Sequence, residues 1–118
     1  MPDICHKLTA LFRRRDPPTA LLVSRAGFVL TTMGHLLRSG QRVPQDVAVI
    51  SRDNEAFLSQ MVPSVARYFV SPETMAYRIF SAVTEVLRGG SPGPADHLIM
   101  PEFTEGETLG PSLDSAHA

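Results

Sequence analysis

The segment from Arg42 to Asn54 constrains the fold more than any other part of this chain. A proline-stiffened turn leads into the β-branched run Val47–Ile50, which is typical of a buried strand. This run is followed by two adjacent polar residues, Asp53 and Asn54. Because the carboxyl ends of strands in an open α/β sheet face the ligand crevice, we expect Asp53 and Asn54 to lie where a small molecule binds.

The preceding residues complete a strand–helix–strand unit. Residues 19–24 form an uninterrupted apolar run, which is typical of a strand that is covered on both faces. Residues 27–38 have helical spacing with a broad apolar stripe, and Gly40 is a natural left-handed terminator just past their end. Two strands joined by a helix over this length predict a right-handed βαβ unit with parallel strands.

Further elements are predicted from hydrophobic period and end signals. They are a helix at 4–14 capped by Asp3, a short amphipathic piece at 55–61, a third strand at 65–70, a helix at 71–87 that begins Ser71-Pro72-Glu73, and a last short strand at 97–100. The apolar residues expected to face inward on the 71–87 helix are Met75, Ile79, Val83, Val86 and Leu87. We therefore expect one domain over residues 1–111 and a flexible tail over 112–118.

Charge and cysteine content exclude several classes of protein. The 118 residues carry 11 basic and 12 acidic side chains, so no field of one sign attracts nucleic acid or an anionic membrane. The single cysteine, Cys5, excludes an internal disulfide and fits a reducing compartment. The first residues lack the pattern of a signal peptide, and no apolar run is long enough to cross a bilayer. We expect a cytoplasmic chain without membrane contact.

Patterns for catalysis and metal binding are also missing from the sequence. There is no G-x-S-x-G elbow, no glycine-rich phosphate loop and no carboxylate pair at a defined catalytic spacing. The four histidines lack the spacing of a metal site; they are His6, His35, His97 and His117. We therefore expect neither an enzyme nor a bound metal or cofactor.

With these elements placed, the chain resembles the LacI/GalR family of bacterial transcriptional regulators over roughly residues 19–111. The family pattern has a V-P-x-D-V-x-V strand, an aspartate corner, a later proline, a G-G-x-x-P loop and a closing L-P stretch. The chain matches it, in order, at Val43-Pro44, Asp46-Val47, Val49, Asp53, Pro63, Gly89-Gly90 and Met100-Pro101-Glu102, and Thr104 to Gly110 stands where the closing motif lies.

The resemblance implies an α/β fold with a partial three-layer parallel sheet of the periplasmic-binding-protein-like type I. It covers only the C-terminal third of such a repressor, and no part of the chain looks like the helix-turn-helix. Operator DNA would therefore be contacted only through an N-terminal domain that this chain does not encode. We expect a fragment of a longer protein or a truncated gene product, in which the 71–87 helix faces a missing lobe of the sensor.

The resemblance also implies ligand-binding residues. Asp53 matches an aspartate that accepts hydrogen bonds from a sugar hydroxyl or purine group, and Asn54 is its neighbour. Arg25 stands where many members carry a pocket asparagine, and Val70 where some carry a polar pocket residue. Arginine suits a more anionic effector. Two alternatives remain open: Arg25 could pair internally with Asp53, and Asp53 could simply cap the next turn.

Leu30, Gln60 and Met61 match positions on the dimer face of the family's sensor lobe, although Leu30 could equally be core. The leading interpretation is the C-terminal portion of the ligand-sensing and dimerisation domain of a homodimeric regulator. A sugar-like effector would bind between lobes, shift their arrangement and so change operator affinity. The alternatives are a fragment of a transport system's sugar-binding protein, a stand-alone dimerising α/β module and a small enzyme.

Overall fold

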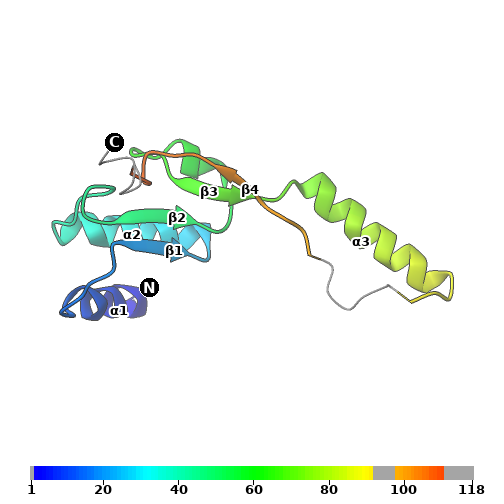
Figure 1. Ribbon diagram of the computed structural model, residues 1–118, viewed down its shortest axis with the longest axis horizontal. Helices are drawn as coiled ribbons and strands as arrows, with labels where there is room; N and C mark the ends of the chain where they lie inside the picture. Colours follow the sequence, from blue (N-terminus) through cyan, green and yellow to red (C-terminus); the bar gives the residue numbers. More distant parts are fainter. Residues whose placement is uncertain (1, 92–97, 111–118) are drawn as a thin grey trace, which may run out of the picture.

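Four strands form one sheet in the order β1-β2-β3-β4 in the computed structural model, which describes residues 2–91 and 98–110 (Figure 1). The strands are β1 (Ala20–Val23), β2 (Ala48–Ser51), β3 (Ala66–Phe69) and β4 (Glu102–Thr104). β1 pairs with β2 and β2 with β3 in parallel, while β4 runs antiparallel to β3. The expected α/β class with a partial sheet is confirmed, but the sheet is mostly rather than wholly parallel, because β4 is antiparallel.

The predicted strand–helix–strand unit forms around helix α2 (Ala26–Arg38), which connects β1 to β2. Its inward residues Val29 and Leu36 are fully buried, and Leu36 packs with Val47 and Val49 in one core cluster. The backbone N–H of Gln41 donates to the carbonyl of Leu36, and Gly40 adopts a φ of +76°. This left-handed residue ends the helix as expected and returns the chain toward β2.

Helix α1 (Pro2–Phe12) packs against α2 through buried Leu8 and through a hydrogen bond between Thr9 Oγ1 and His35 Nε2. The helix ends at Phe12, two residues before the predicted end. Asp3 lies inside the first turn and pairs with Lys7 at 3.0 Å, so its predicted role as the helix cap is wrong. The short piece at 55–61 contains a 3-10 helix, η1 (Ala56–Ser59).

Two strand predictions are corrected by the sheet. Residues 98–100 are not a strand, and His97 lies outside the described residues; the chain instead pairs with β3 further on, at Glu102–Thr104. Across this pair of strands, the ring centroids of Tyr68 and Phe103 lie 5.4 Å apart. β1 is not covered on both faces, because Leu22 is 65% exposed. It is also the outermost strand of the described sheet.

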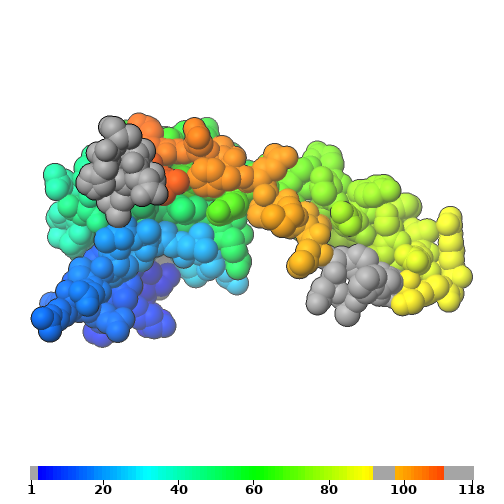
Figure 2. Space-filling model, viewed as in Figure 1, coloured from blue at the N-terminus to red at the C-terminus, as the bar shows by residue number. Residues whose placement is uncertain are grey.

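Helix α3 (Pro72–Leu87) projects from the body as an arm (Figure 1). It begins as predicted, with Ser71 Oγ accepting a hydrogen bond from the Thr74 backbone N–H at 3.3 Å and Pro72 at its first position. No residue of α3 is buried, so its predicted inward face is open to solvent in this chain. Figure 2 shows the arm joined to the body by a narrow waist.

None of the helices in the described part of the chain combines the length and the apolar character that crossing a membrane requires. The predicted tail at 112–118 lies outside the described residues.

Candidate functional site

The sheet register brings the predicted ligand residues to one edge. Val23, Ser51 and Arg67 are aligned across β1, β2 and β3. Arg25 follows the end of β1 by two residues, and Asp53 follows the end of β2 by two residues. The three parallel strands point the same way, toward the side from which α3 leaves the body (Figure 1). Polar groups from three neighbouring strands therefore gather where the strands end, which we call the carboxyl edge.

Arg25 occupies the N-cap position of α2 without capping the helix by its side chain. The residue is exposed, and its guanidinium lies over the ring of Phe28 at 5.8 Å from the ring centroid. Such a cation–π contact is weak at an exposed position. The cation is therefore oriented along the first turn of α2 while its N–H donors stay accessible.

Asp53 is presented by a buried serine. Ser51, at the end of β2, is fully buried, and its hydroxyl donates to the backbone carbonyl of Asp53 at 2.6 Å. The Asp53 carboxylate stays about half exposed, with Oδ1 3.7 Å from Nε of Arg52. Within residues 2–91 and 98–110 this carboxylate neither pairs with Arg25 nor accepts a hydrogen bond from a backbone N–H. The described chain thus supports neither structural alternative for Asp53.

Asn54 is held by a residue that the sequence analysis did not single out. Its Oδ1 accepts a hydrogen bond from Nε of Arg67 at 2.7 Å. The same guanidinium donates through Nη1 to the carbonyl of Val65 at 3.1 Å. Val70, by contrast, is half-buried in the link between β3 and α3 and brings no polar group to the edge. Arg67 therefore joins the predicted set, and the register of β3 with β2 is the signal that would have found it.

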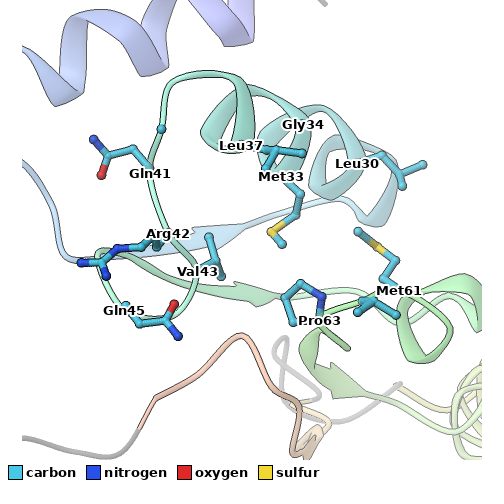
Figure 3. A pocket seen from close by; sticks show the side chains of 12 residues that line it. Leu30, Met33, Gly34, Leu37, Gln41, Arg42, Val43, Gln45, Met61 and Pro63 are labelled. Carbon is cyan, nitrogen blue, oxygen red and sulfur yellow. The ribbon is translucent and has the colours of Figure 1, made fainter.

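A second region lies along the later turns of α2, beyond its first turn (Figure 3). A pocket of about 510 Å³ opens between α2 and two turns, one before β2 and one after η1. Figure 3 shows the side chains of Met33, Val43 and Pro63 around this space. Leu30 and Met61 both line the pocket, and Leu30 is 52% exposed, so it is not a core residue. Gln60 instead ends η1 and does not line the pocket.

An ion pair closes the turn beside this pocket. Arg42 Nε and Nη2 donate to the two carboxylate oxygens of Asp46 at 3.1 and 3.0 Å, and the Arg42 backbone N–H donates to Oδ2 at 2.7 Å. These hydrogen bonds lower the pKa of Asp46, and the carboxylate raises the pKa of Arg42. Both residues are exposed, so the pair fixes the geometry of the turn more than it stabilises the fold.

His35 is the most enclosed histidine of the described chain, at 7% exposed. The Thr9 hydroxyl donates to the carbonyl of Cys5, so it accepts from His35 Nε2. Nδ1 has no partner within the described residues. Groups of three or more metal-ligating side chains are likewise absent from this part of the chain.

The comparison with protein families shows which family the chain belongs to. Residues 3–109 match the periplasmic binding protein-like domain. The chain belongs to this family. The comparison with curated protein sequences finds no match.

The solved structures that resemble the domain include several LacI-family transcriptional regulators. One from Bifidobacterium animalis has a TM-score of 0.75 at 15% identity, over 92% of this chain and 40% of its own. One from Arthrobacter, in complex with lactose, has a TM-score of 0.72 at 18% identity, over 90% of this chain and 41% of its own. A sugar-binding regulator from Escherichia coli, complexed with phosphate, has a TM-score of 0.62 at 23% identity, over 77% of this chain and 32% of its own.

These likenesses confirm the expected fold and the resemblance in structure to LacI-family regulators. The neighbours named above are transcriptional regulators rather than enzymes. The chain spans between 32% and 41% of the length of these three structures.

Proposed function

We propose that the chain is the C-terminal part of the effector-sensing domain of a cytoplasmic LacI/GalR-type transcriptional regulator. Residues 1–111 would supply one wall of the effector cleft, and the carboxyl edge would be the surface that contacts the effector. The observation that carries this proposal is the convergence of Arg25, Asp53 and Asn54 at the strand ends of a mostly parallel sheet. Ligands of open α/β sheets bind at such ends.

The direction of the α3 arm supports the same arrangement. β3 leaves the sheet at the carboxyl edge, and the exposed α3 follows it immediately (Figure 1). A second lobe that covered the apolar side of α3 would lie across from the carboxyl edge. The cleft between the two lobes would then contain Asp53, and effector binding would favour one relative position of the lobes.

The pocket beside Leu30 and Met61 supports a dimer contact on a different face. Its lining is mostly apolar and includes exposed Leu30 and Val62, the kind of surface that interfaces between subunits use. Effector binding would then involve the start of α2, and dimerisation would involve its later turns, which carry Leu30. Operator DNA would be bound through a domain outside this chain.

Substitution of Asp53 tests the effector role. In the full-length protein, we expect Asp53→Ala to abolish the effect of the effector on DNA binding, because a truncated side chain cannot accept hydrogen bonds from ligand hydroxyls. Operator affinity without effector should stay within about twofold of the parent, since DNA is bound elsewhere. The measurement is a DNA-binding titration on operator fragments selected by the protein from genomic DNA, with and without lactose, glucose and glucose 6-phosphate.

Asp16→Ala is the matched control, because Asp16 is an exposed aspartate before the start of β1, at the opposite end of that strand from the carboxyl edge. This variant should keep the effector response. If Asp53→Ala responds to effector as the parent does, the assignment of the carboxyl edge is wrong.

A further inference from the structure

Three arginines, rather than one, lie at the carboxyl edge. Arg25 follows β1, Arg52 follows β2, and Arg67 lies in β3 in register with the last residue of β2. Neighbouring strands are about 5 Å apart, so three consecutive strands span about 10 Å, which is within the combined reach of two arginine side chains. These three arginines outnumber the two carboxylates that follow β2, Asp53 and Glu55, although the whole chain has a net charge of −1.

Two of these cations have no carboxylate partner in the described part of the chain. The acceptors of Arg67 are the amide oxygen of Asn54 and the carbonyl of Val65, which are both neutral. Arg25 faces only the ring of Phe28. Among residues 2–91 and 98–110, Asp53 is the one carboxylate that pairs with an arginine of this edge, with its Oδ1 3.7 Å from Nε of Arg52. Half-buried Arg67 is thus held in place by neutral groups without its charge being balanced.

The start of α2 adds further attraction for an anion. No side chain caps this 13-residue helix, and its first turn contains no acidic residue. The first backbone N–H groups of a helix have no partner within the helix, and the helix dipole is positive there. Gly27, in the same turn, has open space where a side chain would begin, so a ligand can approach the backbone. The guanidinium of Arg25 lies over the ring of Phe28, a residue of this same first turn.

We infer that the effector carries an oxyanion, a phosphate or a carboxylate, in addition to hydroxyl groups. Arg25, Arg67 and the first turn of α2 would hold the oxyanion through charge-assisted hydrogen bonds. Asp53 would accept from the hydroxyls, while Arg52 offsets its negative charge. The inference rests on the proposed function and narrows its ligand class from sugars in general to sugar phosphates or sugar acids.

Binding of four probes by the full-length protein tests the inference. The probes are glucose, glucose 6-phosphate, gluconate and inorganic phosphate, titrated calorimetrically at one fixed ionic strength. We expect at least one of the two charged sugars to bind about tenfold or more tightly than glucose, because one added charge-assisted pair contributes about that much. Preference for glucose 6-phosphate identifies a phosphate, and preference for gluconate identifies a carboxylate. Inorganic phosphate should compete with the preferred probe.

Three variants locate the anion site. Arg25→Gln and Arg67→Gln should each weaken binding of the charged probe about tenfold or more. The affinity of the parent protein for the charged probe should also fall as the salt concentration is raised. Arg38→Gln is the matched control, since Arg38 is exposed at the opposite end of α2. The Arg38→Gln variant should bind the charged probe with the same affinity as the parent protein. Circular dichroism of each variant checks that the fold is kept, because Arg67 also holds Asn54.

The outcomes separate this inference from the proposed function. If glucose binding depends on Asp53 and neither charged sugar binds more tightly than glucose, the inferred oxyanion is wrong. The proposed effector cleft is then still supported. The inferred oxyanion is also wrong if neither charged sugar nor phosphate binds. It is likewise wrong if the Arg25 and Arg67 variants bind the charged probe as tightly as the parent protein does. Charged-probe binding that needs Arg25 but does not alter DNA affinity supports the anion site and contradicts the regulatory role.

Discussion

Thr108 joins the sheet at a point where two strands need an extra partner. It is fully buried, and its hydroxyl donates to the carbonyl of Val49 at 2.6 Å while accepting from the N–H of Ala66 at 2.9 Å. Its own carbonyl accepts from the N–H of Val49. One side chain therefore satisfies a buried backbone donor and a buried backbone acceptor on neighbouring strands. Gly106 makes this approach possible, because a Cβ there would lie 2.3 Å from the backbone nitrogen of Ala66.

Replacement of Thr108 by valine should destabilise the fold, although the two side chains have nearly the same shape. The variant leaves the Val49 carbonyl and the Ala66 N–H buried without partners, and each such group costs about 1–3 kcal/mol. We expect the free energy of unfolding of the full-length protein to fall by at least 2 kcal/mol in a urea titration. Thr19→Val, the same change at an exposed position, should shift it by less than about 0.5 kcal/mol. Equal shifts would show that the Thr108 hydroxyl is dispensable.

The pocket between α2 and the turn after η1 is formed by several elements together. Leu30 on α2 and Met61 after η1 come from segments about 30 residues apart in the sequence and line one surface. If this surface is the dimer contact, Leu30→Glu should convert a dimer to a monomer, because a buried unpaired carboxylate costs several kcal/mol. Sedimentation equilibrium of the full-length protein measures the change.

Two further substitutions sharpen the dimer test. Leu30→Met keeps an apolar side chain of similar size and should keep the dimer. Gln60→Glu should weaken association less than Leu30→Glu does, because Gln60 does not line the pocket. A dimer that persists in Leu30→Glu contradicts the assignment of this face.

Elements with strong local signals were predictable from the sequence, and elements set by distant pairing were not. The βαβ unit follows from the period of residues 27–38 and from Gly40, and the start of α3 follows from Ser71-Pro72. β4 was misplaced because its three residues, Glu102–Thr104, become a strand only through β3. The candidate ligand residues Asp53 and Asn54 could be listed from a strand end, and Arg25 from the family resemblance. Arg67 could not, since only the register shows that it reaches Asn54.

At the scale of the whole molecule, the chain is too extended for its length. Its radius of gyration is 18.4 Å, whereas a compact domain of 118 residues has a value of about 13.5 Å. The α3 arm accounts for much of the excess length (Figure 2). Several apolar side chains on it are more than half exposed, among them Ile79, Phe80 and Val83. Such a surface in water favours contact with another protein surface.

The 118-residue chain produced alone should therefore self-associate. We expect a molar mass by light scattering that rises with protein concentration, and a broad thermal transition by circular dichroism. Ile79→Glu combined with Val83→Glu should reduce the association, because two charges interrupt the apolar side of α3. Ser81→Glu, on the opposite side of the helix, is the control and should leave it unchanged. A monomer with a sharp, cooperative transition would contradict the dependence on a second lobe.

The outermost position of β1 leaves one side of the sheet extensible. In the described part of the chain, the backbone groups of Ala20–Val23 that point away from β2 are free to receive another strand, and Leu22 offers an apolar contact to whatever covers it. Backbone pairing does not require the incoming strand to be covalently continuous with β1. If the chain acts in a sensor domain as proposed, a separately made polypeptide that carries a second lobe could dock along β1 and over α3, and the two polypeptides would assemble by complementation.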